Sequence, residues 1–306
     1  MIYIPKIALD NLEHGISMIK QKQIIAMLLV LCTAVLFSVS GMHAAEADNQ
    51  QTWNLTSYTA DHAAQSAAAP KMKIIISGTG GTVTNNYYIK KNIPQSQLTS
   101  QIIALSKKGT PIIRFGNGSG LKVMIIAGVH GNELPSQIAA LKLANYLKGK
   151  SLNGTVYIVP FVVPSSTAKN IRYWKGKNLN SVANVAGTPT NKILNIAKKL
   201  NVTVLGDFHS TQPGGVPGKM AVFSTKHPTY KSYAIAKYIS KKTGSSLIVY
   251  NLAGTEYPGA LEDASNLAGI PAVTCEVLSP HGVVKSGSVT KSYNQMIALL
   301  KYKKII

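Results

Sequence analysis

Residues 125–147 read IIAGVHGNELPSQIAALKLANYL and join an apolar, β-branched run to a helical pattern through a glycine-containing turn. The turn places His130 at the end of a predicted strand and Glu133 in the first turn of a predicted helix, with Asn132 as the candidate N-cap. Such an elbow can direct an imidazole and a carboxylate at one point, as a zinc site requires. Taken alone, Glu133 is equally explained as an acid favoured by the positive end of the helix dipole.

The chain from residue 111 onward alternates short β-branched runs with helical patterns. The predicted strands cover 122–127, 155–160, 202–207, 219–224, 246–250 and 272–277. The predicted helices cover 134–148, 189–200, 228–242, 260–268 and 288–302. This alternation predicts an α/β fold with a mostly parallel or mixed central sheet and helices on both faces. In such sheets, sites form at the carboxyl ends of the strands.

Two further predicted strands end in polar residues. The segment VTVLGDFHST closes on His209, with Asp207 two residues before it, and GIPAVTCEV places Glu276 near the end of an apolar strand. A carboxylate on a buried strand is costly unless it has a partner or a purpose. The alternatives are that His209 is a loop histidine with its hydrogen bonds satisfied, and that Glu276 forms an ion pair with a neighbouring lysine. Together, however, His130, Glu133 and His209 would leave a fourth zinc position for water, and Glu276 would be the general base and acid.

The order of these motifs resembles the zinc carboxypeptidase clan and, within it, the succinylglutamate desuccinylase/aspartoacylase family. The shared pattern is H-x-x-E, then Arg and Asn, then D-x-H-S-T, then a strand glutamate preceded by P-G-x-L and G-I-P-A, and it covers about residues 111–300. The resemblance implies a zinc carboxypeptidase-like fold with one zinc ion per chain. It implies His130, Glu133 and His209 as the zinc ligands and Glu276 as the catalytic base and acid.

The resemblance also bears on residues of the segment after the second predicted strand. It implies that Arg172 stabilises the oxyanion, where the alternative is an exposed loop arginine. The relatives carry Asp-Leu-Asn-Arg where this chain reads NLNS. Asn178 therefore brings no charge to a ligand histidine, and Ser181 cannot grip a terminal carboxylate as a bidentate guanidinium does. Asn180 is retained as a candidate substrate contact, and Tyr257 is a second candidate that equally fits a turn residue.

The first 110 residues differ in character from the rest. The apolar run IIAMLLVLCTAVLFSV follows a basic start and precedes small residues, which indicates a signal peptide within 1–47. An uncleaved membrane anchor is the alternative, and Met18 is a second possible start of translation. Residues 48–70 are expected to form a linker, and 71–110 a small β-rich appended segment or prosegment. The zinc hydrolase domain is then expected to cover 111–306.

The composition is strongly basic, with 32 Lys and Arg against 11 Asp and Glu and a formal net charge of +21. The excess is almost wholly lysine, because Arg114 and Arg172 are the only arginines. It indicates either a solvated lysine-rich surface or an anionic partner. Nucleic acid is disfavoured, since the lysines are scattered without interleaved aromatics and guanidinium base readers are missing.

These observations together predict an extracellular or cell-envelope zinc-dependent amide-bond hydrolase, either a metallopeptidase or a deacylase. Its expected substrate is a peptide or an acylated amino acid, its expected partner an anionic cell-wall polymer. Membrane contact is expected only through the N-terminal segment if that segment is not cleaved. Two alternatives remain open: an N-acyl amino acid deacylase of the type that the resemblance suggests, and a non-catalytic zinc-containing wall-binding protein.

Overall fold

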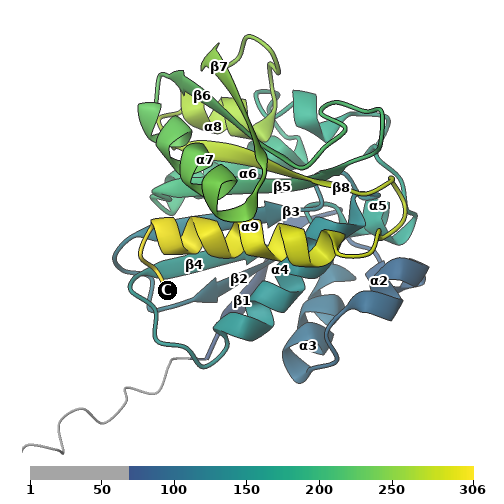
Figure 1. Cartoon of the computed structure of the whole chain (residues 1–306). Helices are drawn as coiled ribbons and strands as arrows, with labels where there is room; N and C mark the ends of the chain where they lie inside the picture. The colour runs from purple at the N-terminus through teal and green to yellow at the C-terminus, as the bar shows by residue number, and fades with distance from the viewer. Residues whose placement is uncertain (1–68) are drawn as a thin grey trace, which may run out of the picture. The chain divides into compact units, whose positions relative to one another are not determined.

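The described part of the chain, residues 69–306 of a computed structural model, is built around an eight-stranded mixed sheet (Figure 1). The strand order is β1-β2-β4-β3-β5-β8-β6-β7. The strands are β1 (Lys71–Ser77), β2 (Gly109–Phe115), β3 (Lys122–Ala127), β4 (Thr155–Val159), β5 (Val204–Thr211), β6 (Ala221–His227), β7 (Ser246–Leu252) and β8 (Ala272–Leu278). The central strands β4, β3, β5 and β8 are parallel, and β2 and β6 join them antiparallel on either side. The predicted α/β fold with a mixed sheet is confirmed.

Helices cover both faces of the sheet. One face carries α2 (Tyr87–Asn92), α3 (Gln97–Ser106), α4 (Leu134–Leu147), α7 (Tyr230–Thr243) and α9 (Ser288–Tyr302), and the other carries α6 (Pro189–Lys199) and α8 (Leu261–Leu267). The connections contain α5 (Pro164–Ala168) and two short 3-10 helices, η1 (Val83–Asn85) and η2 (Leu179–Ser181).

Strand β3 shows why a strand covered on both faces reads as a continuous apolar run. Val123 and Ile125 pack into the core on the α4 side, whereas Met124 and Ile126 pack into the core on the α6 side. Successive side chains of a strand point to opposite faces, so every position is buried when helices cover both.

The segment 71–110 is not the separate β-rich element that the sequence predicts. Its strand β1 pairs antiparallel with β2 and so belongs to the central sheet. The run TVTNNYYI, which reads as a strand, instead forms η1 and the start of α2. Asn86 caps α2, because its side chain accepts hydrogen bonds from the backbone N–H groups of Tyr88 and Ile89. The domain therefore includes β1 and does not begin at residue 111.

A chain that begins at residue 111 is expected not to fold, whereas one that begins at residue 69 is expected to fold. The shorter chain lacks β1 and loses the fully buried side chains of Val83, Ile89 and Ile102 from the core. Each such loss costs about 2–5 kcal/mol, against a total stability of about 5–15 kcal/mol. Circular dichroism with thermal unfolding compares the two chains, and a cooperative transition in the shorter one would contradict this prediction.

The predictions for the N-terminus concern residues outside the described part of the chain. They include the signal peptide or anchor within 1–47, the alternative start at Met18, and the linker as far as residue 68. They therefore stay predictions. Within residues 69–306, no helix combines the length and the apolar character needed to cross a membrane.

Candidate functional site

The candidate site residues lie at the carboxyl ends of three neighbouring parallel strands. His130 follows β3, His209 lies on β5, and Glu276 lies on β8, opposite His209 in the register of these two strands. Glu133 directly precedes α4. The sheet thus brings together side chains that are far apart in the sequence, at the edge where parallel sheets commonly form sites.

The turn between β3 and α4 differs in one detail from its sequence-based prediction. Helix α4 begins at Leu134, so Glu133 and not Asn132 occupies the N-cap position, and its side chain makes no capping hydrogen bond. The Glu133 carboxylate therefore points toward the histidines instead of the helix N–H groups. Gly131 makes the turn possible, because a Cβ atom there would lie 2.5 Å from the backbone nitrogen of Thr167.

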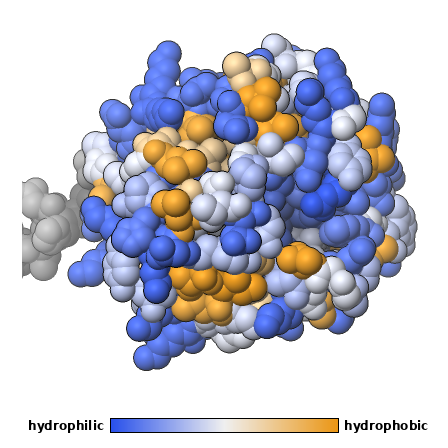
Figure 2. Space-filling view, turned by 90° about the horizontal axis from the view of Figure 1, so that it is seen from above, coloured by the Kyte–Doolittle hydropathy of each residue, from blue (hydrophilic) through white to orange (hydrophobic). Residues whose placement is uncertain are grey.

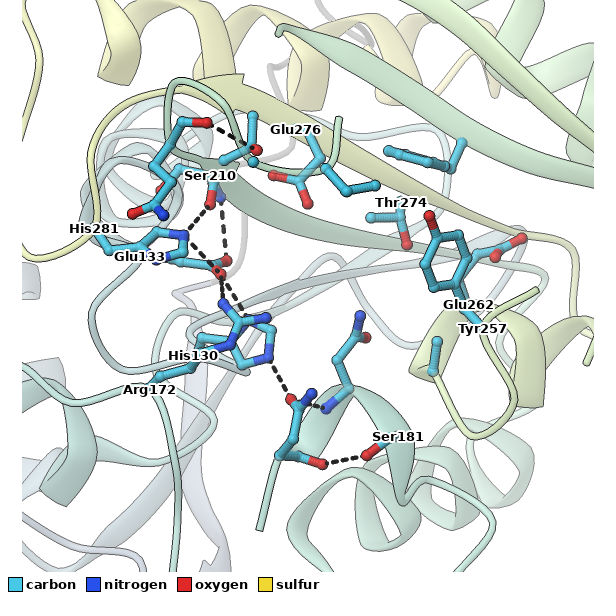
Figure 3. A pocket seen from close by; sticks show the side chains of 18 of the residues that line it. His130, Glu133, Arg172, Ser181, Ser210, Tyr257, Glu262, Thr274, Glu276 and His281 are labelled. Atoms are coloured by element: carbon cyan, nitrogen blue, oxygen red, sulfur yellow. Dashed lines mark hydrogen bonds and ion pairs between the residues drawn. The ribbon is translucent and has the colours of Figure 1, made fainter. Parts of the chain in front are cut away.

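The Glu133 carboxylate is the centre of the site (Figure 3). Its Oε1 lies 2.7 Å from His130 Nδ1, and its Oε2 lies 2.8 Å from His209 Nδ1. Arg172 Nη1 donates to Oε1 at 2.7 Å, and the backbone N–H of Ser210 donates to Oε2 at 3.2 Å. Burial would raise the pKa of Glu133, but the charges and hydrogen bonds of the two histidines outweigh it and hold that pKa well below its usual range.

His130, Glu133 and His209 form a group that can hold a metal ion. All three are buried, and one ligand atom from each lies within 4.8 Å of the others. Two imidazole nitrogens and one carboxylate oxygen are a donor set of catalytic zinc sites, in which a further position stays open for water or substrate. The chemistry of the donors therefore fits zinc.

Each histidine of this group also has an acceptor near its other ring nitrogen. Asn178 Oδ1 lies 2.8 Å from His130 Nε2 and also accepts from the backbone N–H of Asn180. An amide oxygen only accepts, so Nε2 of His130 carries a hydrogen, and Nδ1, which faces Glu133, is the nitrogen that would bind a metal in place of this hydrogen bond. Asp207 Oδ2 lies 3.0 Å from His209 Nε2, although the two groups lack the alignment of a hydrogen bond.

Replacing Asn178 by alanine is expected to weaken zinc binding by about 10–100-fold, the loss typical of a partner that orients a ligand histidine. Asn178→Asp is the matched variant, because it keeps the acceptor and adds a negative charge, and its affinity is expected to equal or exceed that of the native protein. Competition with a zinc-binding dye measures both. Native affinity in Asn178→Ala would mean that His130 needs no partner for its orientation.

Glu276 projects beside this group, and one of its carboxyl oxygens has no hydrogen bond to the described residues. Its Oε2 is buried and has no hydrogen-bond partner within residues 69–306. Burial and then the negative charge of Glu133 raise the pKa of Glu276 well above its usual range. A carboxyl group in this environment can exchange a proton with a bound molecule.

A cavity of about 500 Å³ opens beside the Glu133 carboxylate. His209 contacts Glu133 but is not part of the cavity wall. The other candidate site residues all line it: His130, Glu133, Arg172, Asn180, Tyr257 and Glu276. Ser181, the position at which the resemblance implies an arginine, lines it too, and its Oγ donates to the backbone carbonyl of Asn178 at 3.0 Å.

The cavity wall also contains His281, Glu262 and Ser210, which the sequence reading does not single out. His281 Nε2 lies 3.2 Å from the carbonyl oxygen of Ser210 and 3.7 Å from Glu133 Oε1. It follows the end of β8, so the strand-end signal that identifies His209 would also have identified it. Glu262 lies on α8 and has no comparable local signal.

Comparison with known proteins gives one match to a family. The model of the succinylglutamate desuccinylase/aspartoacylase catalytic domain matches residues 119–302, which include all the candidate site residues. No curated protein sequence matches the chain.

Several solved structures share the fold. A succinylglutamate desuccinylase/aspartoacylase from Rhodobacter sphaeroides is 20% identical with a TM-score of 0.50, and the alignment covers 66% of this chain and 62% of that one. A protein from Shewanella amazonensis assigned to the metallopeptidases is 15% identical with a TM-score of 0.52, covering 64% and 83%. A variant of the cell shape determinant protein Csd4 from Helicobacter pylori is 15% identical with a TM-score of 0.52, covering 64% and 55%. The chain thus spans less than two thirds of the length of the Rhodobacter protein.

Proposed function

The chain belongs to the succinylglutamate desuccinylase/aspartoacylase catalytic-domain family, and we propose that it is a zinc-dependent amide hydrolase that is exported and acts on cell-envelope peptides. The observation that carries the hydrolase assignment is the convergence of His130, Glu133 and His209, next to a cavity that Glu276 also lines. Metal-assisted amide hydrolysis needs a metal-binding donor set and a separate carboxyl group that moves protons, and these residues supply both.

Each side chain has a separate task in this reaction. The chemistry that zinc supplies when bound is polarisation of the scissile carbonyl and a lower pKa for the attacking water. Glu276 takes a proton from the water and delivers it to the leaving nitrogen. Arg172 faces the negative charge that develops on the carbonyl oxygen. Its Nη1 binds Glu133, and its guanidinium group carries further N–H donors for that oxygen.

Three features of the chain and the name of one structural neighbour favour an envelope peptide over a small free acid as the substrate. Ser181 offers a single hydroxyl, already bound to the Asn178 carbonyl, where a carboxylate-binding arginine would be expected. The net charge of +21 attracts acidic polymers, and the face seen in Figure 2 is largely hydrophilic with separate apolar patches. The apolar run within residues 1–47 supports export. The name of one structural neighbour, a cell shape determinant, agrees with an envelope role.

A second candidate function is deacylation of small N-acyl amino acids. It is favoured by the description of the matched family and by the name of the Rhodobacter neighbour. The same catalytic residues would serve both reactions, so the two functions differ in what the cavity binds and not in how the amide is cleaved.

Parallel incubations with purified cell-wall material and with N-acylated amino acids, both with zinc present, test the proposal. We expect new amino termini from the wall material, a stop on addition of a chelator, and recovery on addition of zinc. Faster release from the N-acylated amino acids would select the deacylase. Binding to the wall without release from either substrate would select the non-catalytic alternative and overturn the proposed function.

A further inference from the structure

Carboxyl groups gather in the cavity although the chain as a whole is strongly basic. Its wall contains the carboxyl groups of Glu133, Glu262 and Glu276 and, at an exposed position, Glu256, and no lysine lies among its lining residues. Glu133 is paired with Arg172 and with the two histidines, so its charge is balanced within the site. An interior carboxyl group elsewhere in the wall that lacks such a partner favours a ligand with a positive group.

The carboxyl groups lie at different parts of the cavity (Figure 3). Glu133 lies on one side with His130 and Arg172, whereas Glu262 and Tyr257 lie on the opposite side. Glu256 is exposed, so its charge is largely screened by solvent. Glu262 is therefore the interior carboxyl group that amide hydrolysis leaves without a role.

Glu262 is buried and held in place, but it has no cationic partner. It is 5% exposed, and Asn266 Nδ2 donates to its Oε1 at 2.5 Å. Asn266 is fixed in turn, because its Oδ1 accepts from the backbone N–H of Ala272 and from Ser232 Oγ. Within residues 69–306, the ion pairs all involve Glu133 or Asp207 and none involves Glu262.

Burial and then the negative charge of Asp263 raise the pKa of Glu262 well above its usual range. A cation placed beside the carboxyl group would relieve both effects, because it supplies the missing opposite charge in a place that water solvates poorly. A bound cation would therefore stabilise the ionised form of Glu262, which its surroundings otherwise disfavour.

Aromatic rings complete this end of the cavity. Phe223 and Tyr257 both line it, with ring centroids 5.9 Å apart and ring planes at 90°. Tyr250 packs against both rings, at 6.4 Å from Phe223 and 5.7 Å from Tyr257. The faces of aromatic rings attract cations, and rings combined with a carboxylate suit an ammonium group better than a neutral or anionic one.

We propose that Glu262, Phe223 and Tyr257 form a subsite for a primary ammonium group of the substrate. This inference rests on the proposed function, since it assigns the second end of the same cavity. The ammonium group has two possible sources, the free α-amine of a peptide and the side chain of a diamino acid such as lysine. The surface would then attract an acidic polymer while the cavity selects an amine within it.

Pairs of synthetic amide substrates test the subsite through a ratio of rates. One pair differs only in lysine against norleucine, and a second only in a free against an acetylated α-amine. In at least one pair, kcat/KM is expected to be roughly 10- to 100-fold higher for the substrate with the free amine, which is the usual contribution of hydrogen bonds to a charged group. The pair that shows this difference identifies which amine the subsite binds. Glu262→Gln, which removes the charge with little change of shape, is expected to bring this ratio close to unity.

Glu256→Gln is the matched control, because it makes the same chemical change at an exposed position and is expected to keep the preference. A ratio is unaffected by the fraction of active protein, so a poorly folded variant cannot imitate the expected result. Hydrolysis without preference for either amine would overturn the subsite and leave the proposed function intact. If the preference for the amine persists in Glu262→Gln, the assignment of the subsite to Glu262 is overturned as well.

Calorimetric binding distinguishes failure of the subsite from failure of the proposed function. If no substrate is hydrolysed, the zinc-loaded protein is titrated with N-acetyl-lysine amide and with N-acetyl-norleucine amide. Tighter binding of the lysine compound, lost in Glu262→Gln, would support the subsite although the hydrolase proposal fails. Equal binding of these two compounds, and equal binding of norleucine amide and N-acetyl-norleucine amide, would overturn the subsite for both sources of the amine.

Discussion

Glu276→Gln is expected to lower kcat for amide hydrolysis by about 10²–10⁴-fold, the usual contribution of a general acid–base group. Glutamine has almost the shape of glutamate, but its amide can neither take a proton from water nor deliver one to the leaving nitrogen. Glu276 lies opposite His209 in the sheet, and its buried Oε2 has no hydrogen-bond partner within residues 69–306. The substitution therefore removes proton transfer without breaking a described side-chain contact of that oxygen.

Zinc content and kcat at saturating substrate are measured together for this variant. Glu276 is not part of the metal-binding group, so its zinc content is expected to match that of the native protein. Glu256→Gln, with the same chemical change at an exposed position, is expected to keep native kcat. Native turnover in Glu276→Gln, or loss of zinc from it, would contradict the role assigned to Glu276.

The variants His130→Ala and His209→Ala are each expected to lose zinc. Each removes one of three donor atoms, so the fall in affinity should exceed the about 10–100-fold that follows from loss of an outer partner such as Asn178. Both histidines are buried and bring Nδ1 to the Glu133 carboxylate, so each substitution removes a donor from the point at which the three ligand atoms converge. Metal analysis after dialysis, together with dye competition, measures the loss.

His281→Ala is the matched control for these two variants. His281 lies in the same cavity, with Nε2 3.7 Å from Glu133 Oε1, but it is outside the group of converging ligand atoms. It is therefore expected to keep its zinc. A loss of zinc from His281→Ala as complete as that from His209→Ala would mean that the ligand set is different.

The strands that carry the site could be predicted from the sequence because their signals are local. The runs before His130, His209 and Glu276 are apolar and end on polar residues, as buried parallel strands do at the sheet edge that forms sites. Once three such strands share a sheet, their ends must lie at the same edge. The pattern of apolar runs that end on polar residues therefore predicts both the fold and the proximity of these side chains.

The features that the sequence did not reveal depend on contacts between distant segments. β1 joins the sheet only because β2, over 30 residues later, pairs with it. The helix α2 forms despite the strand-like run because Asn86 caps it, and the Asn86 amide also donates to the carbonyl oxygen of Thr167. Glu262 lines the cavity because of the way α8 packs on the sheet, and no motif in the sequence predicts that packing.

Titration of zinc into the metal-stripped protein, followed by release of new amino groups from cell-wall peptide, is the most direct test of the hydrolase. Hydrolysis is expected to rise with added zinc and to level off at about one zinc ion per chain, the number that the candidate group found within residues 69–306 would hold. Glu276→Gln should bind the same amount of zinc and release almost nothing. Full hydrolysis by the stripped protein, or none after zinc has bound, would contradict the proposed zinc-dependent reaction.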